Sequence, residues 1–189
     1  MIATRMILLR HAPTSAVEAS AFPRDEPIDA RRTLKLLAGA GMRDRPDRVW
    51  LSPAMCAGQT AALLGLSGSV DGALRDCDYG DWSGRTLEAV AESQREDVER
   101  WLTDPASTPH GGESVLDLLR RVGAWLDDRR RDPGLAMAVT HAAVIRAAIV
   151  HVLRAEPSSF WRIDIEPLSR TVLTASQGHW RLRALYPIN

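Results

Sequence analysis

The sequence is poor in cysteine and in lysine: it has two cysteines, Cys56 and Cys77, and a single lysine, Lys35. Two cysteines are too few for a disulfide framework, and their spacing does not match a cysteine-based metal motif, so we expect a reducing, intracellular setting. Because arginine supplies every other basic side chain, the chain has many planar groups that suit anion recognition. The codon bias of a GC-rich genome produces the same excess of arginine, and we favour that explanation.

Net charge and long hydrophobic runs are also absent. The 24 basic residues balance 24 acidic ones, so no overall field favours nucleic acid, a membrane surface or a polyanion. The longest apolar stretch, 135–153, is too polar for a membrane span because four side chains interrupt it; these are Thr140, His141, Arg146 and His151. The start of the chain has neither a long apolar run nor a small-residue cleavage site. We therefore expect a soluble, cytoplasmic protein that binds neither nucleic acid nor a membrane.

The 189 residues, 45% of them hydrophobic, suffice for one substantial core, and we expect a single domain, 1–189. Apolar runs typical of buried strands alternate with amphipathic helical segments. The expected strands are 6–10, 48–53, 70–74, 135–140 and a hairpin within 170–186; the expected helices are 30–41, 54–65, 87–102, 111–128 and 142–153. This alternation predicts an α/β fold with three layers: a mostly parallel central sheet, helices on both faces, and a C-terminal antiparallel hairpin.

Side-chain chemistry adds local detail to the first two predicted helices. In the first, the spacing of Leu34, Leu37 and Ala38 indicates a face turned towards the core. In the second, Ser52 is expected to be the N-cap, because a serine followed by proline is typical of a helix start. Cys56 is then expected in or beside the first helical turn.

Two of the buried strands end in the same way. The runs ILLRH and AMAVTH place His11 and His141 directly after the strands 6–10 and 135–140. If these strands are parallel neighbours, both histidines emerge at the carboxyl edge of the sheet, where ligands bind in α/β folds. Each histidine precedes a turn or helix start whose unpaired N–H groups favour an anion. Together with Arg10, they indicate a phosphate site.

Five motifs resemble, in this order and spacing, those of the histidine phosphatase (phosphoglycerate mutase-like) superfamily: LLRHAPT, LSPAMCAGQTA, LRDCDYGDWSG, GGES and VTHAAVIR. The resemblance runs from residue 6 to about residue 150, and its pattern is most similar to the small α-ribazole-phosphatase and broad-specificity phosphatase branch. It implies a hydrolase of the histidine phosphatase type. Such an enzyme acts on a small phosphorylated metabolite through a phosphohistidine intermediate, and we expect neither a metal nor a cofactor.

The same resemblance implies a role for each matching residue. His11 is the nucleophile that takes the phosphoryl group, since an imidazole nitrogen is substantially unprotonated near neutral pH. Arg10 clamps the phosphate oxygens, and His141 donates to the same oxygens. Asp76 stands where the family usually has a glutamate that protonates the leaving oxygen; turn formation is the alternative role for this loop aspartate. Thr14 is either a substrate contact or only the cap of a turn.

The sequence departs from the family pattern at three positions. Cys56 replaces an arginine, Val17 replaces an asparagine that contacts phosphate, and Ala142 replaces a glycine. By position, Cys56 and Ala142 are nevertheless assigned to the substrate-binding set, with Arg10 and Thr14. A hydrogen bond to a charged group is worth roughly 1.5–3 kcal/mol, so the loss of two such contacts is the reason for an alternative to the leading phosphatase hypothesis. That alternative is a degenerate, weakly active or non-catalytic protein that binds a phosphorylated ligand or another protein.

Other interpretations stay open at this stage. Three arginines in loops or near strand starts are candidates to replace the missing one: Arg24, Arg75 and Arg170. Cys56 is either a packing residue, as most free cysteines are, or a reactive thiol beside a helix N-terminus. A phosphoglycerate mutase is less favoured, because members of that subfamily generally carry an added substrate-capping insertion. The substrate and the oligomeric state are not specified by the sequence, and a homodimer is one arrangement that it allows.

Overall fold

The computed structural model describes residues 4–38, 44–176 and 178–186. Within these ranges it contains a six-stranded sheet in the order β3-β2-β4-β1-β5-β6. The strands are β1 (Thr4–Arg10), β2 (Arg48–Leu51), β3 (Ser69–Val70), β4 (Gly134–Thr140), β5 (Arg170–Ser176) and β6 (His179–Tyr186). The first four strands are parallel to their neighbours, in the pairs β1–β4, β4–β2 and β2–β3. The β5–β6 hairpin extends the sheet, with β5 antiparallel to β1. The predicted mostly parallel sheet with a C-terminal hairpin is confirmed.

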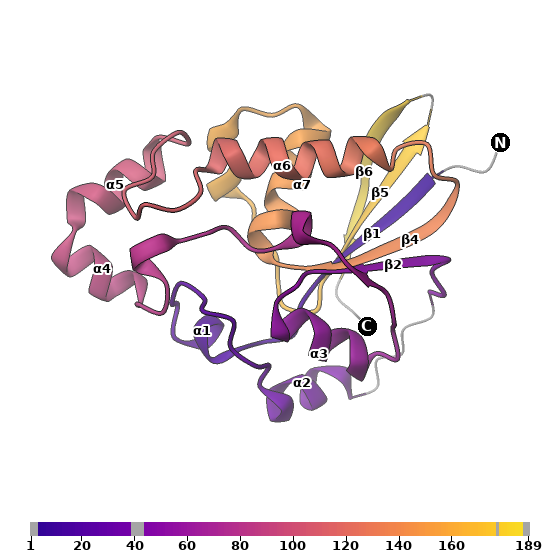
Figure 1. Ribbon diagram of the computed structural model, residues 1–189, viewed down its shortest axis with the longest axis horizontal. Helices are drawn as coiled ribbons and strands as arrows, with labels where there is room; N and C mark the ends of the chain where they lie inside the picture. The colour runs from indigo at the N-terminus through magenta and orange to yellow at the C-terminus, as the bar shows by residue number, and fades with distance from the viewer. Residues whose placement is uncertain (1–3, 39–43, 177, 187–189) are drawn as a thin grey trace.

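Helices cover both faces of this sheet, which gives the predicted three layers (Figure 1). α6 and α7 pack on one face, and α2 and α3 pack on the other, while α4 and α5 extend to one side of the sheet (Figure 1). The α-helices are α1 (Ser15–Glu18), α2 (Ala30–Leu37), α3 (Met55–Leu63), α4 (Leu87–Ser93), α5 (Arg95–Thr103), α6 (Val115–Asp128) and α7 (Ala142–Leu153). Three short 3-10 turns are η1 (Gly72–Leu74), η2 (Gly80–Trp82) and η3 (Pro157–Arg162).

β1 lies inside the sheet, between β4 and β5. Met6 and Leu8 belong to the core under α6 and α7, whereas Ile7 and Leu9 belong to the core on the opposite face. None of these four side chains is more than 1% exposed. Burial on both faces explains why the run is apolar throughout instead of alternating with polar residues.

A third hydrophobic cluster lies under α4 and α5, apart from the two sheet cores. It consists of four buried side chains and two partly buried aromatic rings: Phe22, Trp82, Val90, Val98, Tyr79 and Trp101. The ring centroid of Phe22 is 5.0 Å from that of Tyr79 and 5.3 Å from that of Trp82. These contacts join the loop before α2 to the loop around η2, and both loops contribute lining residues to the same cavity.

The predicted helix 87–102 is corrected to two helices, α4 and α5, that meet at Gln94. The backbone of Gln94 is not helical (φ −142°, ψ 49°), and its Oε1 accepts a hydrogen bond from Trp82 Nε1 at 2.6 Å. Both helices bury residues in the same aromatic cluster. The apolar spacing therefore continues across the break, which is why the sequence resembles one helix.

The predicted strand 70–74 is also shorter than expected, because β3 ends at Val70 and η1 follows. Asp71 is the N-cap of η1, and its Oδ1 accepts from the backbone N–H of Ala73 at 2.9 Å. This local side-chain bond turns the backbone out of the extended conformation.

The buried face of α2 differs from the prediction. Thr33 is fully buried, whereas Leu34 is 60% exposed; Leu37 is partly buried, as predicted. The hydroxyl of Thr33 donates to the backbone carbonyl four residues earlier at 2.6 Å, so its burial leaves no polar atom unpaired. Residues 39–41 of this predicted helix lie outside the described residues.

Ser52 is not the N-cap of α3, contrary to the prediction. The N-cap position is Ala54, and it makes no side-chain capping bond. The hydroxyl of Ser52 contacts His141 at 2.7 Å and accepts from Ala54 N at 3.3 Å. Cys56 is the second residue of α3, in the predicted first turn.

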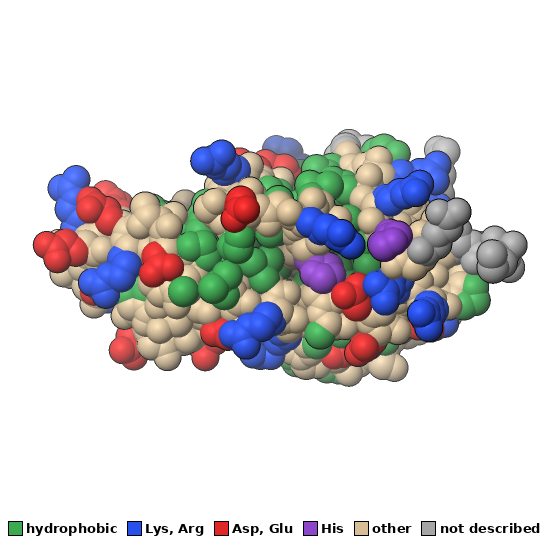
Figure 2. Space-filling view, turned by 90° about the horizontal axis from the view of Figure 1, so that it is seen from above, with side chains coloured by type: hydrophobic (Ala, Val, Ile, Leu, Met, Phe, Trp, Pro, Cys, Tyr) green, Lys and Arg blue, Asp and Glu red, His purple; other side chains and the backbone are tan. Residues whose placement is uncertain are grey.

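The molecular surface carries charges of both signs. Figure 2 shows acidic and basic side chains interspersed on the face that includes α6, with neither sign forming a continuous patch among the coloured residues. This distribution agrees with the formal net charge of zero. In the described part of the chain, no helix has the length and hydropathy needed to cross a membrane.

Candidate active site

β1 and β4 bring the two predicted histidines together. The strands pair in parallel with Arg10 opposite Thr140, and His11 N donates to Thr140 O at 2.9 Å. His11 and His141 follow directly, so both emerge at one edge of the sheet. Their ring centroids are 5.1 Å apart and the ring planes are inclined by 63°, and the residues are only 6% and 3% exposed. The structure thus confirms that the two strand ends place these imidazoles side by side.

A backbone hydrogen bond fixes the tautomer of His11. Its Nδ1 lies 2.7 Å from the carbonyl oxygen of Ala12, and because a carbonyl only accepts, Nδ1 carries the proton. The lone pair is therefore on Nε2. The backbone N–H of Ala12 donates to Thr60 Oγ1 at 2.9 Å, and that hydroxyl donates to Cys56 O at 2.7 Å. α3 therefore holds the chain directly after the nucleophile candidate in place.

His141 is oriented from two sides. Its Nε2 is 2.7 Å from Ser52 Oγ, at the end of β2, and its Nδ1 is 3.5 Å from Asp76 Oδ2. Nδ1 is buried and has no hydrogen-bond partner among the described residues. Sequence reasoning missed Ser52, although it lies in the quoted LSPAMCAGQTA motif, because the adjacency of β2 and β4 is not visible in the sequence.

Both imidazoles are neutral in the absence of a ligand. Burial lowers the pKa of His11 from 6.5 to about 4, and the neighbouring His141 adds to this shift. Burial likewise lowers the pKa of His141 to about 4, with the positive charge of Arg10 as the second cause. A neutral imidazole keeps a lone pair for attack, whereas a bound phosphate would favour the protonated form of its neighbour by charge attraction.

Asp76 lies on the loop after η1, within ion-pair distance of His141. Its Oδ1 accepts from Cys77 N at 2.9 Å. Burial raises the pKa of Asp76, and this hydrogen bond and the positive charge of Arg10 oppose that increase. A carboxyl group with a raised pKa holds its proton closer to neutral pH, as a proton donor must. The structure therefore brings Asp76 together with both histidines.

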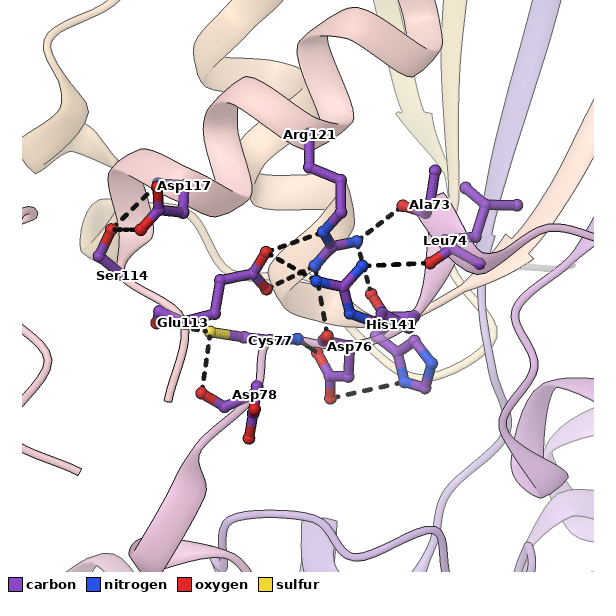
Figure 3. A network of polar contacts seen from close by, with 12 residues as sticks. Ala73, Leu74, Asp76, Cys77, Asp78, Glu113, Ser114, Asp117, Arg121 and His141 are labelled. Atoms are coloured by element: carbon purple, nitrogen blue, oxygen red, sulfur yellow. Dashed lines mark hydrogen bonds and ion pairs between the residues drawn. The ribbon is translucent and has the colours of Figure 1, made fainter. Parts of the chain in front are cut away.

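α6 holds the loop that carries Asp76. Arg121 pairs with Glu113 through two bonds, Nε to Oε1 at 2.8 Å and Nη2 to Oε2 at 2.6 Å. The same guanidinium donates to the carbonyl oxygens of Ala73 at 2.7 Å, Arg75 at 3.1 Å and Asp76 at 3.3 Å. Figure 3 shows these contacts converging on the loop beside His141. Arg121 was missed by sequence reasoning, because no local pattern shows that α6 packs over this loop.

A cavity of about 360 Å³ opens onto these groups. Five predicted site residues line it: His11, Thr14, Cys56, Asp76 and His141. Its other lining residues come from the loops before α2, before α3 and after η1: Pro23, Arg24, Asp25, Glu26, Pro53, Ala54, Cys77, Asp78, Tyr79 and Ser83. Loops thus form the mouth of the cavity, and the strand ends form its floor.

Two predicted residues lie beside the cavity and not among its lining residues. Arg10 donates from Nη1 to the carbonyl of Ile165, and its buried Nε has no hydrogen-bond partner among the described residues. Burial lowers the pKa of Arg10. Ala142 is the first residue of α7. Thr14, by contrast, lines the cavity and also caps α1, because its Oγ1 accepts from Val17 N at 3.4 Å.

The three arginines that are candidates to replace the missing one differ in their position relative to the cavity. Arg24 lines the cavity and donates from Nε to Ser83 O at 2.9 Å. Arg75 pairs with Glu113 at 3.3 Å, and Arg170 pairs with Asp44 at 3.0 Å. Of these three arginines, Arg24 is the one positioned to face a ligand.

Cys56 lies inside the cavity, at the start of α3. Burial raises the pKa of its thiol to about 12, and the negative charge of Asp76 adds to the shift. Of the two interpretations of Cys56, the reactive thiol beside a helix N-terminus is therefore wrong, because its thiol stays protonated near neutral pH. Its sulfur and one ring nitrogen from each of His11 and His141 all lie within 4.8 Å of one another, so these three side chains could hold a metal ion.

Several known proteins share this fold. The profile of the family described as "Histidine phosphatase superfamily (branch 1)" matches residues 6–187. The alpha-ribazole phosphatase from Shigella flexneri has the same fold, with a TM-score of 0.83 and 21% identity over 97% of this chain and 96% of that one. Mycobacterial glucosyl-3-phosphoglycerate phosphatase superposes with a TM-score of 0.84 and 24% identity over 98% of this chain and 99% of that one.

A relative of higher identity is longer than this chain. The sequence is 31% identical over 180 residues to Bifunctional protein Rv2228c of Mycobacterium tuberculosis, a match that covers 89% of this chain and 50% of that protein. The chain thus spans half the length of this relative. Because the family profile matches nearly all of the chain and the two histidines occupy one cavity, the chain belongs to the histidine phosphatase superfamily, branch 1.

Proposed function

We propose that this chain is a metal-independent phosphomonoesterase that works through a phosphohistidine on His11. One observation carries the proposal: two buried, neutral imidazoles lie 5.1 Å apart on one cavity, and the tautomer of His11 leaves Nε2 free. Membership of the histidine phosphatase superfamily supports it.

In the first step, His11 Nε2 attacks the phosphorus atom and the bond from phosphorus to the ester oxygen breaks. Asp76 gives its proton to that oxygen, which leaves as an alcohol. His141 stabilises the negative charge on the transferring phosphoryl oxygens, held in place by Ser52. Arg10 supplies positive charge beside the cavity, and Arg24 supplies it at the mouth.

In the second step, water attacks the phosphohistidine. The Asp76 carboxylate takes a proton from this water, the bond from nitrogen to phosphorus breaks, and inorganic phosphate leaves. Aspartate has one methylene less than the usual glutamate, so Asp76 must lie close to the reacting oxygen. The bonds from Arg121 to the carbonyl oxygens around this loop hold it near His141.

A small phosphorylated metabolite is the substrate class that fits this cavity. Its volume of about 360 Å³ lies near the lower end of the usual range for small-molecule sites. The mouth carries one arginine, Arg24, and three acidic residues, Asp25, Glu26 and Asp78. A substrate with a single phosphate and a neutral or cationic leaving group is favoured over a polyanion, because the acidic side chains repel additional negative charge.

The test is hydrolysis of a chromogenic aryl phosphate in the presence of EDTA, comparing the unmodified protein with His11→Ala. We expect His11→Ala to lower kcat by about 10³-fold or more, because it removes the nucleophile. His179→Ala is the matched control, since His179 is exposed on β6 and outside the cavity. Equal rates for the unmodified protein and His11→Ala would overturn the proposal.

A second candidate function is favoured by one observation, the presence of Cys56 in the cavity where the family pattern has arginine. It is a protein that binds a phosphorylated ligand without turnover. In the same experiment this function predicts no hydrolysis by either protein, together with binding of inorganic phosphate that His11→Ala weakens.

A further inference from the structure

The cavity floor contains a set of donor atoms whose grouping the phosphatase chemistry does not explain, because Cys56 takes no part in that chemistry. Cys56 supplies a sulfur, and His11 and His141 each supply a ring nitrogen, all within 4.8 Å of one another. The three residues are 5%, 6% and 3% exposed. They are far apart in the sequence, so no local spacing of ligands reveals the cluster.

The separations are close to those of a metal site. A tetrahedral zinc ion with bonds of about 2.0–2.3 Å holds its nitrogen and sulfur donors about 3.5 Å apart. Donors within 4.8 Å of one another therefore need to approach by no more than about 1.3 Å to reach the separation of about 3.5 Å. Three protein donors with one open position is the ligand number of open zinc sites.

The surroundings orient the histidines as metal ligands are oriented. A histidine that binds a metal usually donates its other ring N–H to a protein acceptor. His11 Nδ1 donates to Ala12 O, and His141 Nε2 contacts Ser52 Oγ. The nitrogens left free are His11 Nε2 and His141 Nδ1, and the latter is buried without a hydrogen-bond partner among the described residues.

We propose that His11, Cys56 and His141 form a binding site for a soft cation, with Zn²⁺ as the divalent case, in which the metal occupies the phosphate position. On binding, the Cys56 thiol releases its proton to solvent, and the ion gains one sulfur and two nitrogens and gives up all but one of its waters. One water stays in the open position. Asp76, within 3.5 Å of His141, adds negative charge beside the cation. An arginine, which the family pattern has in place of Cys56, would repel such an ion. The donor set therefore depends on the presence of cysteine at this position.

The consequence for activity rests on the proposed function. A metal bound to His11 Nε2 occupies the lone pair that attacks phosphorus. Zn²⁺ is then an inhibitor of the phosphatase and not its cofactor, and EDTA restores the rate.

The experiment measures metal binding directly, without substrate. The metal-free protein is titrated with Zn²⁺ against a competing chelator, and separately with Co²⁺ while the absorption spectrum is recorded. We expect one ion per chain and a thiolate-to-cobalt charge-transfer band. Cys56→Ser should weaken zinc binding by about 100-fold or more and abolish the band, because loss of a direct ligand costs at least as much as loss of a supporting contact.

Cys77→Ser is the matched control. Cys77 also lines the cavity, but its sulfur donates to Glu113 O at 3.4 Å and is not part of the donor cluster. It should keep both the affinity and the cobalt band. His11→Gln is the second variant and should lose zinc affinity as Cys56→Ser does; thermal unfolding verifies that each variant is folded.

The outcomes separate this proposal from the phosphatase proposal. Absence of stoichiometric zinc binding, or equal affinity in the unmodified protein and Cys56→Ser, would overturn the metal site and leave the phosphatase untouched. Zinc binding that depends on Cys56, in a protein that hydrolyses no phosphate ester, would support the metal site and count against the phosphatase.

Discussion

Asp76 shows most clearly how the requirements of chemistry and of folding differ at a single residue. Burial raises the pKa of Asp76, so the ionised carboxylate is disfavoured in the folded chain relative to the unfolded chain. This destabilising contribution appears as pH rises through the folded pKa, and it disappears in acid, where both states are protonated. The property that suits Asp76 to donate a proton therefore lowers the free energy of unfolding at neutral pH.

We predict that Asp76→Asn changes activity and stability in opposite directions. It should lower kcat by about 10²–10⁴-fold, since the proton donor is lost, and raise the free energy of unfolding near neutral pH. The asparagine oxygen can still accept from Cys77 N. Urea denaturation and steady-state kinetics check the two effects, and the stability gain should shrink in acid. Asp81→Asn, an exposed change in η2, is the control and should alter neither quantity. A less stable Asp76→Asn protein would contradict this account.

Individual site residues were predictable from the sequence to different degrees. His11 and His141 could be paired because each ends a buried strand, and the parallel pairing of β1 and β4 confirms that logic. Ser52 and Arg121 could not be assigned, because their contacts depend on which strand neighbours β4 and on how α6 crosses a loop. Arg24 could be named only as one of three alternatives, since the path of its loop is set by tertiary contacts with the aromatic cluster.

At the scale of elements, one helix determines where Asp76, the proposed proton donor, lies. The Arg121–Glu113 pair connects α6 to the loop that carries Asp76, and the two side chains are only 13% and 9% exposed. Removing one partner of a largely buried pair leaves the other charge unpaired and costs about 3–5 kcal/mol. The loop also loses the hydrogen bonds that its carbonyl oxygens accept.

We therefore predict that Arg121→Ala destabilises the protein by about 3–5 kcal/mol and lowers kcat more than it changes KM. Arg120→Ala is the matched control, at the residue of α6 that directly precedes Arg121. Arg120 is 77% exposed and pairs with Asp117 on the helix surface, so its loss should cost about 0.5 kcal/mol or less. Chemical denaturation with the same steady-state assay measures both variants. Similar losses of stability in the two variants would be inconsistent with a special role for the buried pair.

The elements themselves were largely predictable, and the errors have local causes. The sheet, the hairpin and most helices follow from hydrophobic periodicity. The break at Gln94 was missed because α4 and α5 share one buried cluster, and Ser52 was mistaken for a cap because a serine before proline is also a sound helix start. In each case a long-range contact decided between locally acceptable structures.

At the scale of the whole molecule, the two histidines connect the site to global stability. Their pKa values of about 4 lie below the ordinary 6.5, so between these values the unfolded chain binds more protons than the folded chain. The free energy of unfolding must then fall as pH decreases through this window, by about 1.4 kcal/mol per pH unit for each group. Asp76 acts in the opposite direction, and an Asp76→Asn background removes its contribution.

In that background, we predict a steep loss of stability from about pH 6.5 to pH 4. A further His11→Gln change should make the slope shallower. His179→Gln should leave the slope as it is, because this histidine is exposed on β6. Urea denaturation at a series of pH values gives the slopes, and an unchanged slope in the His11→Gln protein would refute the assignment.

The position of β1 has a consequence for folding during synthesis. In the sheet, β1 is flanked by β4 and β5, and both are synthesised more than 120 residues after it. At about 5–20 residues per second, roughly 10–30 s pass before those neighbours exist. Throughout that delay the apolar centre of β1 has no strand to pair with, so the cavity floor at the end of β1 forms only after both neighbours have been synthesised.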